Sequence, residues 1–411
     1  MAYPRKKYFK GFKKTGVSLL LLTSLALAAC GQVSQSSMNP SSSVNNLFAT
    51  GDNVTQGLAT DYFSASDYDA SYDVDTASVI NLSGSTATVS GEGVSLSGSV
   101  VTISASGTYI ISGTSEKVQI VVKAAASDKV RLVLDGAHMT GDNAAITVQE
   151  ADTVTITLAE GSQNSISDSS LNSNDEEDAA IFSKSNLVFN GTGSLSVQGQ
   201  YQHAIESKAT LRITGGDYHI ESVGDGLKAT DALNITGASL TITAGEDAVQ
   251  ADNDEDSTLG NLYISDVHLS ISAGDDGIHA SNATVIDSGN IQVTSSTEAI
   301  EGTSVIINGG SLNLYAIDDG INASSDVTGA TIFIKITGGD IKLEVGQGDT
   351  DALDSNGDLI VSGGSLDITA QFAFDFDGVA EYSGGSIVVN GKAVTDITNS
   401  MMMGNGGRLG Q

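Results

Sequence analysis

Six acidic residues recur in the second half of the chain at one position of a repeating pattern. Each precedes a small residue and then an aliphatic one, as in GDGL, EDAV and TEAI. Carboxylates held side by side repel one another by roughly 1 kcal/mol per neighbouring pair in water, and a bound cation reverses that repulsion. Calcium accepts several hard oxygen ligands in flexible geometry, so this pattern predicts a calcium site. The six acids are Asp225, Asp247, Asp276, Glu298, Asp319 and Asp351.

A second acidic feature follows Val249, where an insertion places four acids in the five residues DNDED. Asp252, Asp254 and Asp256 are its candidate calcium ligands, although the glycine and terminal glutamate of an EF-hand are missing. A solvated loop is the alternative for this insertion. For the repeated acids the alternative is turn chemistry, because Asp before Gly is a common corner pair. Turn preference does not explain the acids that precede alanine, such as Asp247 and Glu298.

A mixed set of side chains follows each aliphatic residue and predicts a ligand-facing column with different roles in different repeats. Its members are Glu206, Lys228, Gln250, His279, Glu301, Asn322 and Asp354. The five histidines of the chain have no spacing typical of a metal site, so we expect surface positions for them.

The elements that must position these residues are short strands in a repeat. The aliphatic residue of the pattern recurs at spacings of 22, 22, 29, 22, 21 and 32. A period of about 22 residues predicts a solenoid, with insertions in the two long intervals. The aliphatic series runs through Ile205, Leu227, Val249, Ile278, Ile300, Ile321 and Leu353, and Ile146 and Ile181 extend it backwards.

Within each repeat the alternation of apolar and polar residues is typical of strands with one buried face. In SLTITAGEDAVQA the predicted inward residues are Leu240, Ile242 and Ala244, followed by Val249 and Ala251. Three such strands fit one repeat, with Gly-rich pairs at the corners. The sequence predicts an all-β fold over residues 76–395, a right-handed single-stranded parallel β-helix with about 22 residues per coil. An antiparallel β-sandwich would not keep this period.

The N-terminus has the layout of a bacterial lipoprotein signal. Six basic residues precede the apolar run VSLLLLTSLALAA, which is short for a membrane span. The following Leu-Ala-Ala-Cys resembles a lipobox, and Cys30 is the only cysteine of the chain. We therefore expect a signal peptide over residues 1–29, lipidation of Cys30, and a protein anchored to the extracellular face of the bacterial membrane.

Composition predicts the remaining segments and limits the partners. Residues 30–75 are rich in Ser, Asn and Asp, which predicts a flexible tether, and the Met- and Gly-rich residues 396–411 predict a disordered tail. The formal charge is −32. Removing residues 1–29 leaves 12 basic residues against 50 acidic ones, a charge of −38. Such a chain repels nucleic acid, and we expect a monomer.

Several segments together resemble a bacterial family of calcium-binding carbohydrate-binding domains with a β-helix like that of the pectate lyases. These segments are GVSLSG, VTISASGTYIISG, VRLVLDGAHMTG, VTITLAEGSQNSISD and the DGI and DAL corners. The resemblance covers about residues 76–390. It implies Ca²⁺ as cofactor and a plant-type or acidic polysaccharide as partner, with Asp225, Asp247, Asp276 and Asp319 in the metal role. An anionic protein holds an anionic sugar when cations lie between them.

Two other functions remain open at this point. A polysaccharide lyase would use calcium to acidify the proton beside a uronate carboxylate and a base to remove it, and Lys228 is the candidate base. A non-catalytic adhesion or envelope protein would carry the same anchor without sugar specificity. The sequence favours a calcium-dependent carbohydrate-binding protein without turnover.

Overall fold

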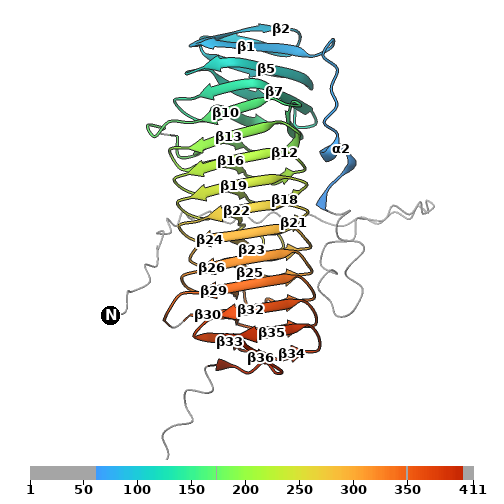
Figure 1. Ribbon diagram of the computed structural model, residues 1–411. Helices are drawn as coiled ribbons and strands as arrows, with labels where there is room; N and C mark the ends of the chain where they lie inside the picture. The colour runs from blue at the N-terminus through green and yellow to red at the C-terminus, as the bar shows by residue number, and fades with distance from the viewer. Residues whose placement is uncertain (1–61, 173, 349, 401–411) are drawn as a thin grey trace, which may run out of the picture. The chain divides into compact units, whose positions relative to one another are not determined.

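The computed structural model describes residues 62–172, 174–348 and 350–400. They form an all-β, open solenoid-like stack in which 36 strands share one continuous hydrogen-bonded sheet (Figure 1). The predicted signal peptide, Cys30, the predicted tether up to residue 61 and the predicted tail from residue 401 lie outside the described residues. Within the described part, no helix is long and apolar enough to cross a membrane.

The strands pair in parallel from one coil to the next in three runs. The first run contains β10 (Gln163–Ser167), β13 (Ser194–Gly199), β16 (Asp217–Ser222), β19 (Ser239–Ala244), β22 (His268–Ser272), β24 (Asn290–Ser295), β26 (Ser311–Ala316), β29 (Asp340–Val345), β32 (Ser365–Thr369) and β35 (Ser386–Val389). The second run contains β4 (Val100–Ile103), β6 (Gln119–Lys123), β8 (Ile146–Glu150), β11 (Ala179–Ser183), β14 (His203–Ser207), β17 (Leu227–Ala229), β20 (Val249–Ala251), β23 (Ile278–Ile286), β25 (Ile300–Ile307), β27 (Ile321–Ala323), β30 (Asp351–Ser355) and β33 (Phe372–Phe376).

The third run contains β7 (Lys129–Thr140), β9 (Thr153–Leu158), β12 (Asn186–Gly191), β15 (Thr210–Ile213), β18 (Ala232–Thr236), β21 (Asn261–Ser265), the second halves of β23 and β25, β28 (Phe333–Ile336), β31 (Asp358–Val361) and β34 (Ala380–Tyr382). At the N-terminal end, β1 (Ser78–Gly84) pairs in parallel with β5 (Gly107–Ser115) and antiparallel with β2 (Thr86–Ser90), and β3 (Val94–Ser97) pairs antiparallel with β4. At the other end, β36 (Lys392–Val394) pairs antiparallel with β35.

The register of the second run confirms the predicted repeat. Each aliphatic residue of the series stands opposite the next, from Ile205 with Leu227 to Ile321 with Leu353, and Ile146 and Ile181 continue it towards the N-terminus. The predicted inward residues of β19 are buried in strict alternation with exposed Ser239, Thr241 and Thr243. A narrow continuous core of aliphatic side chains therefore runs along the stack.

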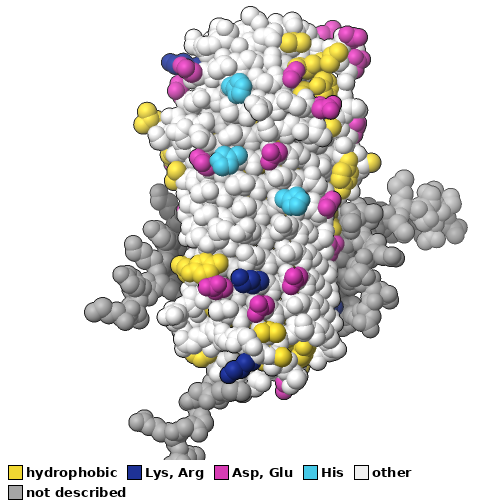
Figure 2. Space-filling model, in the orientation of Figure 1, with side chains coloured by type: hydrophobic (Ala, Val, Ile, Leu, Met, Phe, Trp, Pro, Cys, Tyr) yellow, Lys and Arg dark blue, Asp and Glu magenta, His cyan; other side chains and the backbone are white. Residues whose placement is uncertain are grey.

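The outer face of the first run is polar but carries few charges. Its strands place short polar side chains outward, and Figure 2 shows acidic, basic and histidine side chains scattered singly over this face. The repeated acids of the second run belong to a different side of the coil.

Residues 62–69 do not behave as the flexible tether that their composition predicts. Around the short helix α2 (Ala65–Tyr68) they form a strap against the third run (Figure 1). The Tyr62 ring stacks on Tyr263 at 3.8 Å between centroids, and Phe63 is buried. The Asp67 carbonyl accepts hydrogen bonds from Thr214 Oγ1 (2.6 Å) and Asn190 Nδ2 (3.0 Å). These paired backbone groups and buried rings hold the strap in place.

The first described residues of the predicted tail also pack on the stack. Ile397 is buried, and Asn399 Nδ2 donates to Asp375 Oδ1 at 2.7 Å and to the Phe376 carbonyl at 2.9 Å. Residues 396–400 thus differ from the disordered tail predicted there.

Close approach between coils restricts some corner residues to glycine. Gly191 has φ of +97°, and a Cβ there would lie 2.1 Å from the Leu158 carbonyl oxygen. Gly161 has φ of +71° with open space around it. We expect Gly191→Ala to lower the unfolding midpoint in urea well below that of Gly161→Ala, which suffers only the backbone penalty of about 1 kcal/mol. Equal midpoints would show that the coils can separate locally at no cost.

Candidate functional site

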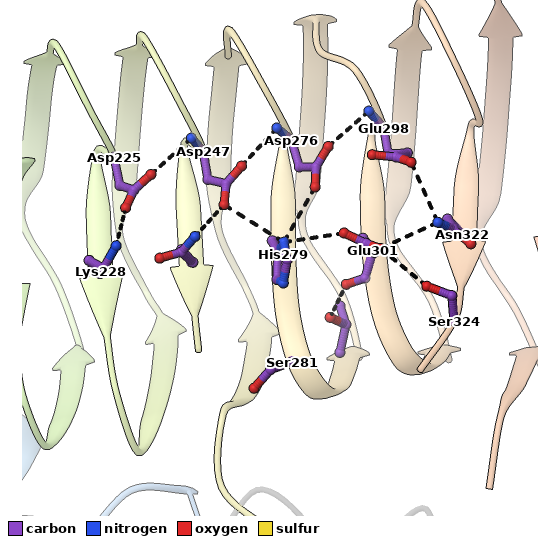
Figure 3. Close-up of polar contacts among 12 residues, drawn as sticks. Asp225, Lys228, Asp247, Asp276, His279, Ser281, Glu298, Glu301, Asn322 and Ser324 are labelled. Atoms are coloured by element: carbon purple, nitrogen blue, oxygen red, sulfur yellow. Dashed lines mark hydrogen bonds and ion pairs between the residues drawn. The ribbon is translucent and has the colours of Figure 1, made fainter. Parts of the chain in front are cut away.

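The repeated acids form a ladder of hydrogen bonds at the turn that leads into the second run (Figure 3). The backbone N–H of Asp247 donates to Asp225 Oδ1 at 3.0 Å. In the same way the amide of Asp276 donates to Asp247 Oδ1 at 2.9 Å, and the amide of Glu298 to Asp276 Oδ1 at 3.0 Å. Further along, the amide of Asp351 donates to Asp319 Oδ1 at 2.7 Å.

The ladder gives these acids a structural role that sequence reasoning did not include. At this corner four of the six acids bond through their amides to the carboxylate one coil earlier, namely Asp247, Asp276, Glu298 and Asp351. A buried amide without an acceptor would cost about 1–3 kcal/mol. Asp225, Asp247 and Asp276 are each at most 5% exposed. Their carboxylates therefore satisfy the backbone of a corner from which water is excluded.

The first rung of the ladder is a histidine. His203 Nδ1 accepts the amide of Asp225 at 2.9 Å, in the place that a carboxylate oxygen takes in later coils. The expectation of a surface position is wrong for His203, which is 5% exposed. Its position before Ala204 and Ile205 matches that of Asp247 before Ala248 and Val249. This match in the sequence could have identified His203 as a member of the ladder.

The second carboxylate oxygen of each rung faces the mixed column, three residues further along the chain. Asp225 Oδ2 accepts a hydrogen bond from Lys228 Nζ at 2.7 Å. Asp247 Oδ2 accepts one from Gln250 Nε2. Asp276 Oδ2 lies 3.3 Å from His279 Nδ1. The two columns predicted from the sequence are thus one network, and the residue at the second position sets the charge of each coil.

Two coils pair an acid of the ladder with an acid of the mixed column, Glu298 with Glu301 and Asp351 with Asp354, and an acidic cluster forms around the first pair. Oxygens of Asp276, Glu298 and Glu301 lie within 4.8 Å of one another. Asn322 Nδ2 donates to Glu301 Oε1 at 3.3 Å and approaches Glu298 Oε1 at 3.5 Å, and His279 Nδ1 lies 3.2 Å from Glu301 Oε2 (Figure 3). We call Asp276, Glu298 and Glu301 the central acid cluster.

The protonation of this cluster follows from burial and like charge. Burial, followed by the proximity of Asp276, raises the pKa of Glu298 to about 10. Burial also raises the pKa of Glu301 to about 7 despite the opposing charge of His279. Burial alone would lower the pKa of His279, but Asp276, Glu301 and Asp247 outweigh it and raise that pKa to about 9. At neutral pH the free cluster therefore retains protons that a cation would displace.

Donor chemistry separates the central acid cluster from the other candidate cation groups. His203 groups with Asp178 and Glu206 and with Asp225 and Glu246. Because its Nδ1 accepts the Asp225 amide, the neutral ring carries its proton on Nε2 and has no lone pair for a metal. In the group of Asp247, Asp276 and His279, the raised pKa keeps the imidazole protonated.

The central acid cluster fits a hard divalent cation. Its three members offer carboxylate oxygens, which calcium prefers. Asn322 faces the cluster with its amide nitrogen, so its Oδ1, which has no hydrogen-bond partner within the described residues, points away from Glu298 and Glu301 (Figure 3). His279, 3.3 Å from Asp276 and 3.2 Å from Glu301, supplies one positive charge against three carboxyl groups. The oxygen donors favour a hard cation for the charge that remains.

The remaining predicted metal ligands are not brought together in this way. Asp254 and Asp256 are exposed in the insertion, and Asp256 Oδ1 accepts hydrogen bonds from the amide and hydroxyl of Thr258. Within the described range, no group of three possible ligands includes Asp252, Asp254, Asp256, Asp319 or Asp351.

Comparison with known proteins adds a family to this geometry. The sequence model of a family described as carbohydrate-binding domain-containing proteins matches residues 97–347 and, in an overlapping second match, residues 284–399. These matches cover more than half of the chain. The chain belongs to this carbohydrate-binding domain family. The resemblance seen in the sequence is thereby confirmed, and the family supports a carbohydrate-binding role.

Two individual proteins are similar to this member of the family. A carbohydrate-binding domain-containing protein of Acetivibrio thermocellus is 30% identical over 122 residues, which are 28% of this chain and 43% of that protein. The chain thus matches less than half of that relative's length. A solved structure described as a polysaccharide lyase-like protein from C. thermocellum, in a gadolinium derivative, shares 21% identity with a TM-score of 0.48. The alignment covers 74% of this chain and 99% of that one.

Proposed function

We propose that this protein is a calcium-dependent carbohydrate-binding lipoprotein for acidic, uronate-type or plant cell-wall polysaccharide. It binds its ligand without turnover. We further propose that the stack is a right-handed single-stranded parallel β-helix, and that lipidated Cys30 holds a monomeric protein on the extracellular face of the membrane. The observation that carries the calcium dependence is the all-oxygen central acid cluster of Asp276, Glu298 and Glu301.

Calcium would be held by these three carboxylates. When bound, it supplies positive charge that attracts the carboxylate of an acidic sugar. The chain's own residues fix the geometry. The Glu298 amide anchors Asp276 through Oδ1, and Asn322 and Ser324 donate to Glu301 Oε1. These bonds hold the oxygens in one place before the ion arrives, which reduces the entropy cost of binding.

The state of Lys228 supports binding without turnover over the lyase alternative. Its ammonium donates to Asp225 at 2.7 Å. Burial acts to lower the pKa of Lys228, but Asp225 outweighs it and holds that pKa above its usual range. A lysine that keeps its proton cannot accept another, so it is a poor general base. The adhesion alternative predicts that no glycan binds.

Calcium binding should release protons, because Glu298 and Glu301 retain them in the free protein at neutral pH. Isothermal titration with calcium in two buffers of different ionisation enthalpy measures the number released. We expect about one to two protons per ion near neutral pH. Glu298→Gln with Glu301→Gln should abolish binding, while the matched pair Asp254→Asn with Asp256→Asn in the insertion should leave it intact. Loss of binding in the insertion pair instead would move the site there.

The same preparation tests the sugar. Polygalacturonate is added with calcium and with chelator, and ultraviolet absorbance is followed for unsaturated product. Binding only with calcium and without product supports the proposal. Rising absorbance would make the protein a lyase, and a failure of every acidic glycan to bind would favour adhesion. Mass spectrometry of the Cys30→Ser variant beside the parent checks the lipid anchor.

A further inference from the structure

A cavity of about 540 Å³ lies between the strap and the N-terminal coils of the third run. This volume falls within the range of small-molecule sites. Its walls come from the strap, from β5, β7 and β9, and from Arg212 on β15. The strap that the sequence did not predict therefore forms one side of the cavity. The residues that the argument uses are Asp67, Thr108, Lys129, Arg131, Thr155 and Arg212.

Positive charge is concentrated in this cavity although the protein is strongly acidic. The described residues contain two arginines, Arg131 and Arg212, and both line it together with Lys129. Each of these three cations has one carboxylate near it. Asp67 Oδ2 lies 3.9 Å from Arg212 and accepts the Ser64 amide, and the exposed Asp152 lies 3.8 Å from the exposed Lys129. Asp69 also attracts Arg131.

Both guanidinium groups keep donors for a ligand. One terminal nitrogen of Arg131 donates to Thr157 Oγ1 at 2.6 Å. Arg212 donates through Nε to the Tyr62 carbonyl at 3.0 Å. Among the described residues neither group donates any other hydrogen bond. Arg131 and Arg212 are therefore each oriented by one bond while their remaining N–H groups line the cavity.

The spacing of the two arginines suits an oligosaccharide. In the third run Arg131 stands opposite Thr155, Thr155 opposite Val188, and Val188 opposite Arg212. The two residues thus share one outward row three coils apart, which places their backbones about 14 Å from each other. Hydroxyl groups of Thr108 and Thr155 lie in the same lining. Two cations at this separation, with the Thr155 hydroxyl between them and that of Thr108 beyond Arg131, match acidic groups carried on different sugar units.

From this geometry we propose that the cavity binds a short uronate-containing saccharide, with Arg131 and Arg212 each holding a sugar carboxylate and Lys129 adding charge at the rim. Guanidinium groups form paired hydrogen bonds with carboxylates. The site deepens the proposed function, on whose acidic ligand it rests, but it needs no calcium. It lies in the third run, whereas the central acid cluster belongs to the corner before the second run. The protein would thus hold acidic polysaccharide at two sites, through bound calcium at the central acid cluster and through arginine side chains in the cavity.

Titration of the full chain with trigalacturonate in the presence of chelator tests the cavity directly. Galactotriose serves as the neutral ligand. We expect trigalacturonate alone to bind, and Arg131→Gln and Arg212→Gln each to weaken it about tenfold or more, because hydrogen bonds to charged groups are among the strong ones. The Lys342→Gln variant, which removes a cation from β29 in the first run, should bind as the parent does. Circular dichroism confirms that each variant is folded.

The outcomes separate the cavity from the calcium site. Binding that needs calcium and is indifferent to both arginine substitutions would overturn the cavity proposal and leave the proposed function in place. No binding of trigalacturonate or polygalacturonate under either condition would overturn both. Equal displacement of trigalacturonate by inorganic phosphate at the same concentration would show a general anion site and contradict the saccharide assignment.

Discussion

The chelated protein should unfold at a lower temperature at about pH 8 than at about pH 5, and calcium should reduce this difference. Burial raises the pKa values of Asp247, Glu301 and Asp354 to about 7 and that of Glu298 to about 10. A carboxyl whose pKa is higher in the folded state stabilises the fold fully below its unfolded pKa. That contribution is lost as the pH rises through the folded value.

The size of this effect can be estimated from Asp247 alone. It is 5% exposed, and a folded pKa near 7 implies a loss of roughly 2–3 kcal/mol between pH 5 and pH 8 as an upper limit. His279, with its pKa raised to about 9, acts in the same direction above its unfolded value. His203 acts in the opposite direction, because burial lowers its pKa to about 4. Its contribution is lost as the pH falls from the unfolded value of about 6.5 towards 4, so it offsets part of the effect between pH 8 and pH 5.

Calorimetric melting with chelator and with excess calcium at both pH values measures how far calcium reduces the difference. Calcium at a hundredfold excess over its dissociation constant would add about 2.7 kcal/mol at pH 8, where the carboxylates are free of protons. The Asp247→Asn variant keeps the acceptor for the Asp276 amide and serves as the matched control with a flatter pH profile. A chelated protein that melts higher at pH 8 would contradict the assigned proton positions.

Asp225→Ala should be the most destabilising single change in the ladder, at about 3–5 kcal/mol. Asp225 is 1% exposed and holds two donors, the Asp247 amide through Oδ1 and the Lys228 ammonium through Oδ2. Its removal leaves a buried amide without an acceptor and a partly buried cation without a counterion. Urea unfolding of the variant, compared with the parent, measures the loss.

A double variant separates the two contributions. Asp225→Asn keeps an oxygen for the Asp247 amide, so its cost should come mainly from the unpaired Lys228. Adding Lys228→Gln gives this coil a neutral pair like the amide that already partners Asp247 in the next coil. We expect the double variant to recover at least half of the stability lost in Asp225→Asn. If it is less stable than Asp225→Asn, the charge of Lys228 is not what destabilises the single variant.

The repeat could be predicted from the sequence because every coil of a solenoid buries the same kinds of residue at the same positions. The aliphatic register from Ile205 to Leu353 and the alternation in β19 follow from burial of one face. The acids were also recognised as one column. Their bonds to backbone amides were not predicted, since residue types alone do not show which donor faces each oxygen.

Contacts between parts of the chain that are distant in sequence could not be predicted from local sequence patterns. Composition predicted a tether at residues 62–69, but Tyr62 and Phe63 find an outward aromatic surface at Tyr263 that no local pattern reveals. His203 was missed because the pattern was defined by acids, whereas the rung requires only an acceptor. Arg131 and Arg212 share a cavity because the coil register and the strap bring them together.

The two ends of the described stack have a consequence for association between molecules. Each end reverses strand direction, with β2 antiparallel to β1 and β36 antiparallel to β35. An open coil would offer unpaired backbone groups to the first coil of another molecule in the same parallel register. The antiparallel hairpins at the two ends interrupt that parallel register. We therefore expect that a second molecule does not continue the stack and that filaments do not form. Crowded copies can therefore remain separate molecules.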